Sequence, residues 1–204
     1  VNKVLFFRNR LAFLAGENVI LSRPGTLGEP DFFAETALTV SANDPIDISC
    51  SSTFPSELFD GIDINSGLVV FSTNQQFLLS SDDTVLNPDT AKLRSIATFN
   101  YNKDVSPISL GTTVAYLDDS GKFSRFNEMA NIAREGEPNV VNQSQVVPTL
   151  LPKDIDLFTN SRENNIVIMG RSYVNDTDTP NSDIVQGFRY LNVGDKREQS
   201  AWFK

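Results

Sequence analysis

Residues 10–23 read RLAFLAGENVILSR, in which two short apolar runs flank the turn-forming triplet Gly16-Glu17-Asn18. Apolar runs of this length on either side of a glycine-containing turn are typical of a β-hairpin. The same design recurs in GLVVFSTNQQFLLS (residues 67–80) and in TTVAYLDDSGKFSRF (residues 112–126). Aligned on one another, the three hairpins place an apolar pair six residues apart around each turn: Phe13 and Val19, Phe71 and Phe77, and Leu117 and Phe123.

The hairpins repeat at offsets of 58 and 46 residues, and a fourth unit is indicated by residues 165–169 returning through residues 184–191. Further strand candidates lie between the hairpins, at residues 46–50, 92–99 and 155–158. A hairpin-centred repeat of this length is typical of β-propeller blades, although an all-β sandwich gives a similar pattern. We therefore expect an all-β fold of three to four propeller-like blades, a partial propeller with long loops and little helix.

The expected domain organisation is one propeller-like domain, or part of one, over residues 1–204. Residues 127–152 are a candidate excursion between blades. Short helices are expected only at residues 56–60 and 127–134. Because the chain starts at Val1 and residues 201–204 have the character of a strand interior, we also expect it to be a piece of a longer polypeptide.

Residue content excludes several classes of chemistry. The 204 residues contain no histidine and one cysteine, Cys50, so histidine-based triads, histidine metal sites and internal disulfides are excluded. Cys50 lies in an alternating strand pattern and is interpreted as a small buried residue. The apolar runs are far shorter than the roughly 18 residues of a membrane helix, which argues against a membrane span.

The charge is unevenly distributed along the chain. The net charge is −9, and residues 24–91 contain eleven acidic side chains but no lysine or arginine. A protein that grips duplex DNA needs a basic patch, and this stretch offers none. It predicts a solvated acidic face, a surface that docks a basic partner, or a surface that repels a passing polyanion.

Candidate catalytic and metal-binding residues are few. The acidic pairs Asp82-Asp83 and Asp118-Asp119 are interpreted as turn residues, because neighbours on a strand point to opposite faces and cannot form a glycosidase dyad alone. Residues 175–183 carry oxygen ligands at alternate positions but lack the glycine of a calcium loop, so they are interpreted as a solvated loop. Trp202 lies in an apolar strand and is expected in the core. We assign no catalytic, cofactor-binding or metal-binding residue.

Several segments, in this order, resemble the tail tubular protein B family, the nozzle proteins of short-tailed, podovirus-type phages. The most specific are residues 4–25 followed by Asp31-Phe32-Phe33, and the DPIDIS run at residues 44–49; residues 67–80 and 201–204 complete the set. The loops at residues 26–30 and 175–183 depart from the family pattern. The resemblance implies a non-enzymatic structural protein of the virion tail with a propeller-like domain.

The same resemblance implies specific partners. Copies of the chain would form a ring, usually a hexamer, below the portal and adaptor; tail fibres are a further partner, and DNA would pass through without being held. The acidic residues 24–91 would suit a surface near that channel. The alternative function is a tail-associated propeller glycosidase or a carbohydrate-binding module that acts on host surface polysaccharide.

Overall fold

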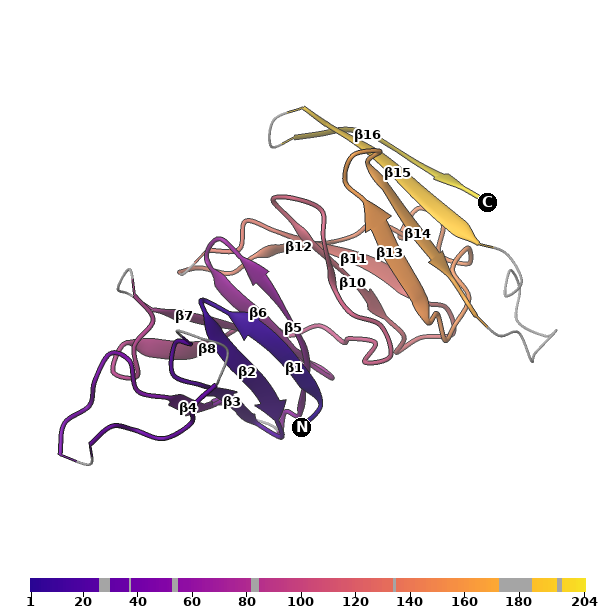
Figure 1. Cartoon of the computed structure of the whole chain (residues 1–204). Coiled ribbons are helices and arrows are strands. Elements are labelled where there is room, and N and C mark those ends of the chain that lie inside the picture. The colour runs from indigo at the N-terminus through magenta and orange to yellow at the C-terminus, as the bar shows by residue number, and fades with distance from the viewer. Residues whose placement is uncertain are drawn as a thin grey trace. The chain divides into compact units, whose positions relative to one another are not determined.

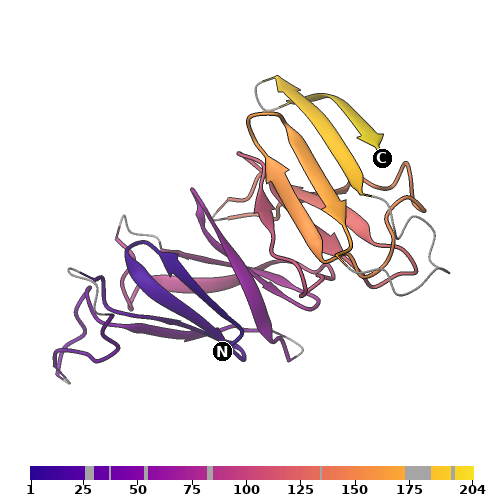
Figure 2. The same ribbon diagram turned by 45° about the vertical axis from the view of Figure 1, so that its right-hand side comes forward.

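The computed structural model describes residues 1–25, 30–36, 38–52, 55–81, 85–133, 135–172, 185–193 and 196–204. Within these ranges the chain folds into sixteen β-strands, which form four antiparallel four-stranded sheets (Figures 1 and 2). The described ranges contain no helix that could cross a membrane. The all-β prediction is confirmed.

Each sheet uses four strands that are consecutive in the sequence. Sheet 1 contains β1 (Lys3–Phe7), β2 (Arg10–Ala15), β3 (Asn18–Leu21) and β4 (Ile46–Ser49). Sheet 2 contains β5 (Leu58–Ile64), β6 (Gly67–Ser72), β7 (Gln76–Ser81) and β8 (Ala91–Ala97). Sheet 3 contains β9 (Ile108–Ser109), β10 (Val114–Asp118), β11 (Arg125–Ala130) and β12 (Asn139–Asn142). Sheet 4 contains β13 (Leu157–Ser161), β14 (Ile166–Gly170), β15 (Gln186–Val193) and β16 (Lys196–Phe203).

The hairpins predicted from the sequence are the central pair of strands in every sheet: β2–β3, β6–β7, β10–β11 and β14–β15. In each sheet every strand pairs with the next, which is the up-and-down order of a propeller blade. The sheets are therefore blade-like units, as the repeat predicted. The apolar pairs aligned from the sequence do not lie directly opposite each other in the ladders, because Phe13 pairs with Ile20, Phe71 with Gln76 and Leu117 with Phe126.

The chain divides into two compact units, which are described separately. Unit 1 consists of Val1–Phe99 and Ala133–Glu137, and unit 2 consists of Asn100–Ile132 and Pro138–Lys204. In unit 1, buried side chains of sheets 1 and 2 form one apolar core, which includes Phe7, Leu14, Leu21, Leu58, Val70, Phe77 and Leu79. In unit 2, buried side chains of sheets 3 and 4 form another, which includes Leu117, Phe126, Val167, Met169 and Phe188.

Both short helices expected from the sequence are wrong. Residues 58–60 begin strand β5, and residues 127–130 belong to strand β11. Each strand carries a buried acidic residue that breaks the apolar alternation: Asp60 on β5 is paired with Lys3, and Glu128 on β11 is paired with Arg197. The stretch 127–152, expected as an excursion between blades, contains the end of β11 and strand β12.

Two predictions about buried residues are confirmed. Cys50 follows β4 and is buried in the core of unit 1, where its thiol lies 3.6 Å from the carbonyl oxygen of Ser56. Trp202 is partly buried on β16 and packs against the core of unit 2, with its ring centroid 4.8 Å from that of Phe188. Trp202 is thus part of a packed aromatic cluster.

Candidate functional site

Of the residues that the sequence singled out for chemistry, the structure describes Cys50, Asp118, Asp119 and Trp202. Asp82, Asp83 and residues 175–183 lie outside the described residues. Within the part of the chain that the structure describes, no group of three or more cysteine, aspartate or glutamate side chains could hold a metal ion. Burial raises the pKa of the Cys50 thiol, so this cysteine is not activated as a nucleophile.

Asp118 and Asp119 stabilise the turn between β10 and β11. The Asp118 carboxylate accepts a hydrogen bond from the Ser120 amide and lies 3.5 Å from an Arg125 guanidinium nitrogen. The Asp119 carboxylate accepts hydrogen bonds from the Asn102 side chain, the Ser124 hydroxyl and the Asp154 amide. Asp119 therefore ties the hairpin turn to the segments before β9 and β13, which is a structural role.

We expect Asp119 to make stability depend on pH in a defined direction. Burial raises the pKa of Asp119, although the bonds from Ser124 and Asp154 oppose the shift. With a folded-state pKa above the unfolded one, its contribution is greatest in acid and is lost as pH rises through the folded value. The free energy of unfolding of the unsubstituted chain, minus that of Asp119→Asn, should therefore fall as the pH rises through the raised pKa of Asp119.

Urea titrations at four or five pH values measure this difference. Ser120→Ala changes the same turn without removing a titrating group, so its difference from the unsubstituted chain should stay flat. A difference for Asp119→Asn that rises with pH would contradict the assignment.

The acidic stretch is partly neutralised by basic residues that precede it in the sequence. Lys3 lies 2.8 Å from Asp60, and Arg23 pairs with both Asp31 and Glu35. Arg10 is buried and donates hydrogen bonds to the carbonyl oxygens of Ser22, Ala42, Asp44 and Leu86. Some described carboxylates of residues 24–91 are exposed and form no ion pair with Lys3, Arg10 or Arg23. These are Asp47, Glu57, Asp63 and Asp89.

A buried ion pair joins sheets 3 and 4 inside unit 2. The Glu128 carboxylate accepts hydrogen bonds from Arg197 at 2.7 and 2.9 Å, from the Thr113 hydroxyl at 2.7 Å and from the Gln143 amide at 2.8 Å. The Arg197 guanidinium also lies 4.8 Å from the centre of the Tyr190 ring. The two bonds from Arg197 fix β16 against sheet 3, and the bonds from Thr113 and Gln143 hold the Glu128 carboxylate in place.

Glu128→Gln should lower the free energy of unfolding by about 2 kcal/mol, because an amide offers one acceptor oxygen where the carboxylate offers two. It also leaves the Arg197 charge buried without its counter-ion. Urea denaturation measures the loss. Glu163→Gln, an exposed change in the β13–β14 turn, should stay within about 0.5 kcal/mol, and equal losses in the two variants would refute a special role for Glu128.

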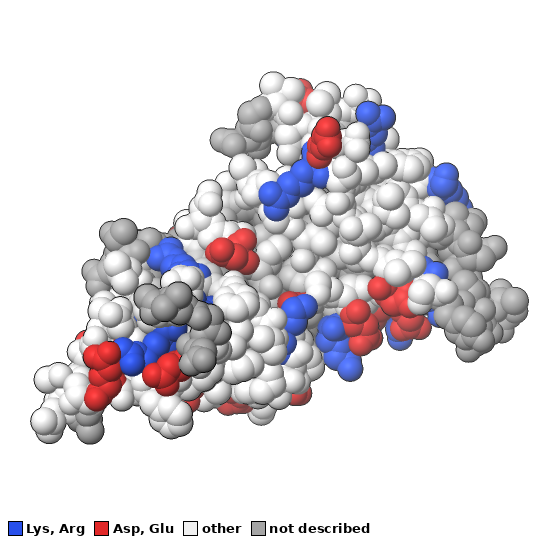
Figure 3. Space-filling view, in the orientation of Figure 1, with Lys and Arg blue, Asp and Glu red and all other residues white. Residues whose placement is uncertain are grey.

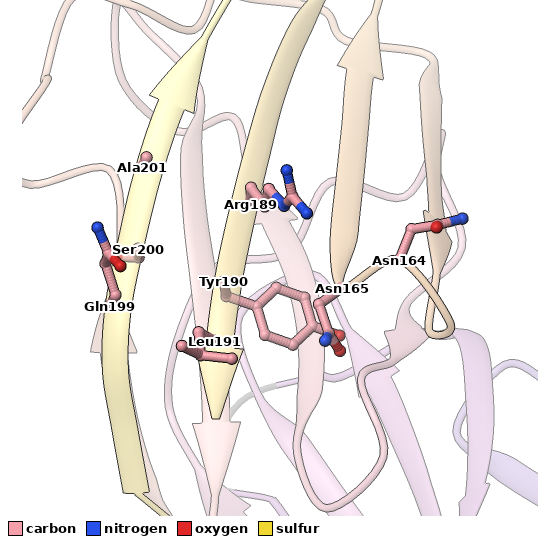
Figure 4. Close-up of a pocket in the computed structure, with 8 residues that line it drawn as sticks. All are labelled: Asn164, Asn165, Arg189, Tyr190, Leu191, Gln199, Ser200 and Ala201. Atoms are coloured by element: carbon pink, nitrogen blue, oxygen red, sulfur yellow. The ribbon is translucent and has the colours of Figure 1, made fainter. Parts of the chain in front are cut away.

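The outer face of sheet 4, opposite the core of unit 2, carries a hollow. The hollow has a volume of about 350 Å³. It is lined by Asn164, Asn165, Arg189, Tyr190, Leu191, Gln199, Ser200 and Ala201 (Figure 4). Leu191 is paired with Gln199 across β15 and β16, and Arg189 is paired with Ala201, so the hollow lies along that pair of strands.

Sheet 1 also has an apolar outer face. The register places Val4, Phe13, Ile20 and Asp47 in one row across the four strands, and Phe6 opposite Leu11 in the next. The Phe32 ring stacks on Phe13 with 5.3 Å between centroids, and Phe6 remains 76% exposed. Neither face could be predicted to be a surface, because strand alternation alone does not tell which face of a sheet is covered.

The chain is similar in sequence to proteins of phage tails. The sequence model of the bacteriophage nozzle protein family matches residues 1–204. The chain is also similar to the tail tubular protein gp12 of Escherichia phage T7, with 27% identity over 205 aligned residues. The alignment covers 99% of this chain and 24% of the relative, so the chain spans about a quarter of the relative's length.

Proposed function

The chain belongs to the bacteriophage nozzle protein family, and on that premise we propose that it is a structural, non-enzymatic part of the tail of a short-tailed phage. In this role it forms part of the tail tube or nozzle that conducts DNA from the portal and adaptor to the host cell. The observation that carries the proposal is the family match over residues 1–204.

The architecture supports this role. Four blade-like sheets, each built around a central hairpin, are an architecture suited to a structural role. We propose that residues 1–204 form a propeller-like domain or part of one. The proposed partners are copies of the same chain in a ring, with a hexamer as the expected number, the adaptor protein above and the tail fibres.

In this role DNA passes the chain as a polyanion and is not bound as a ligand. The exposed carboxylates Asp47, Glu57, Asp63 and Asp89 would weaken contacts with phosphates if they lie near the channel. This surface is smaller than the sequence suggested, because Asp31, Glu35 and Asp60 are paired with cations. Of these, the Asp60 carboxylate is buried against Lys3 and contributes to folding instead.

A reconstruction of the phage particle by electron cryo-microscopy tests the proposal. Density for the four-sheet chain should recur around the central channel of a short tail. Density at the tail periphery alone, as isolated appendages, would overturn the conduit role. A function on host polysaccharide would then be tested first by soaking the particle with host surface polysaccharide and looking for saccharide density on the described sheets.

A further inference from the structure

A second hollow of unit 2 lies at one end of sheet 3. Its volume is about 240 Å³. One wall comes from residues 121–125, in the turn between β10 and β11 and at the start of β11, and the other from residues 142–148, at the end of β12 and just after it. Because both walls lie where strands end, a further sheet packed on a face of this blade would not fill the hollow.

The first wall gives the hollow an excess of positive charge. Lys122 forms no ion pair with any residue that the structure describes, and its ammonium nitrogen lies 5.9 Å from the centre of the Phe123 ring. Arg125 has one such partner, since its Nη1 lies 3.5 Å from the Asp118 carboxylate. The described residues that line the hollow include both cations and no carboxylate. At several other places on the surface, basic and acidic side chains lie side by side (Figure 3).

Gly121 leaves room for the Arg125 guanidinium beside the hollow. A Cβ added at Gly121 would lie 3.6 Å from Nη2 of Arg125, so this nitrogen rests against the glycine backbone. The ion pair with Asp118 uses the other terminal nitrogen, Nη1. Nη2 is therefore left as a hydrogen-bond donor next to a residue that lines the hollow.

The second wall also offers a donor, because its acceptor oxygens are already used. The Asn142 side-chain oxygen accepts hydrogen bonds from the Ser144 amide at 3.0 Å and from the Ser144 hydroxyl at 2.7 Å. A backbone amide can only donate, so this contact identifies the oxygen of the Asn142 side chain and leaves its nitrogen as the donor. The Ser144 hydroxyl oxygen in turn accepts the Phe126 amide at 3.1 Å. Donors on both walls suit an anion.

We propose that this hollow binds one phosphate group, carried by inorganic phosphate or by a phosphorylated sugar. Phosphate oxygens accept charge-assisted hydrogen bonds from lysine and arginine, which are stronger than bonds between neutral groups. The volume is below the roughly 300–1,000 Å³ of sites for drug-sized ligands, so it suits a small group. The Phe123 ring offers an apolar surface to a sugar. The site goes beyond the proposed function and does not rest on it.

A phosphate titration of the isotope-labelled chain, followed by amide nuclear magnetic resonance, tests the proposal. At an ionic strength held constant with chloride, phosphate should shift the backbone amides of Gly121, Lys122 and Gln145, and the shifts should saturate. Lys122→Gln and Arg125→Gln should each raise the dissociation constant at least about tenfold, the cost of losing a hydrogen bond from a charged donor. Arg189→Gln, an exposed change on the outer face of sheet 4, is the control and should leave the constant unchanged.

The two lysine and arginine variants differ in their risk to folding. Arg125→Gln also removes the ion pair with Asp118, so its melting temperature is measured beside its affinity. Lys122→Gln removes no ion pair of the described chain and should melt at the temperature of the unsubstituted chain. The affinity of Lys122→Gln therefore decides the proposal even if Arg125→Gln is unstable.

A comparison of ligands identifies the source of the phosphate. Equal affinity for inorganic phosphate and glucose-6-phosphate assigns the site to the free ion, and tighter binding of glucose-6-phosphate assigns it to a phosphorylated sugar.

Four results would overturn the inference. These are amide shifts that do not saturate with phosphate, shifts that chloride alone reproduces, an unchanged dissociation constant in Lys122→Gln, and a short DNA duplex that shifts the same amides far below the phosphate concentration required. The last would make the hollow part of a DNA-binding surface. None of these results depends on where the chain lies in the particle, so a failure of this inference is distinct from a failure of the proposed function.

Discussion

Arg10→Leu should lower the free energy of unfolding of unit 1 by about 4 kcal/mol, the cost expected for breaking a buried charged hydrogen-bond network. The guanidinium donates four bonds, at 2.7 to 3.2 Å, to carbonyl oxygens of residues 22, 42, 44 and 86. Leucine fills a similar volume but leaves those four carbonyls without their donor. Residues 41–44 and the turn near Leu86 should therefore lose their attachment to β2.

Arg10→Lys distinguishes the effect of the positive charge from that of the guanidinium geometry. Lysine keeps the charge, but its single ammonium group cannot reach all four carbonyl oxygens that the forked guanidinium reaches. We therefore expect the free energy of unfolding to fall by about 2 kcal/mol. Urea denaturation, monitored by far-ultraviolet circular dichroism, measures the free energy of unfolding of both variants. Arg8→Leu, an exposed change in the neighbouring turn, is the matched control and should change stability by less than about 1 kcal/mol. Equal losses at positions 8 and 10 would show that the network does not stabilise the fold.

Arg10 also explains why two separated segments carried the family resemblance. Residues 4–25 and the DPIDIS run at residues 44–49 meet in the structure, because Arg10 donates to the carbonyl of Asp44 and β3 pairs with β4. The Asp44 carboxylate in turn accepts the Ser41 amide. A sequence motif of this kind specifies a local network rather than a catalytic site.

The sequence predicted the centres of the sheets better than their edges. The central hairpins are apolar and have short turns, so alternation and turn residues identify them without further information. Strand β5 was missed, and the end of β11 was expected as a helix, because Asp60 and Glu128 interrupt the apolar pattern. Their partners Lys3 and Arg197 are 57 and 69 residues away, and no local signal reports a neutralising contact over that distance.

The surfaces were less predictable than the strands. The charge count correctly located an acidic stretch, but three of its carboxylates are paired with Lys3 or Arg23, which precede it. Exposure of the apolar faces of sheets 1 and 4 depends on which face each core covers. Packing between sheets determines which face is covered, so the exposed face can be identified only from the folded unit.

Gly67→Ala should prevent unit 1 from folding stably, with an expected loss of about 4 kcal/mol from combined backbone strain and steric overlap. Gly67 begins β6 with a φ of +153°, a conformation that side chains disfavour. A Cβ at this position would lie 2.2 Å from the carbonyl oxygen of Leu79. Since that atom belongs to the backbone of β7, the overlap can be relieved only by moving one strand of the central hairpin of sheet 2.

Gly16→Ala is the control that separates strain from overlap. Gly16 has a φ of +60°, but an added Cβ would meet nothing within 4 Å, so only the strain of about 1 kcal/mol is expected. Soluble yield and the urea midpoint of each variant measure the difference. A Gly67→Ala variant as stable as Gly16→Ala would mean that β6 and β7 are not packed as closely as described. A large loss confined to Gly67→Ala would show that close approach of these two backbones, rather than turn conformation, makes glycine necessary at the start of β6.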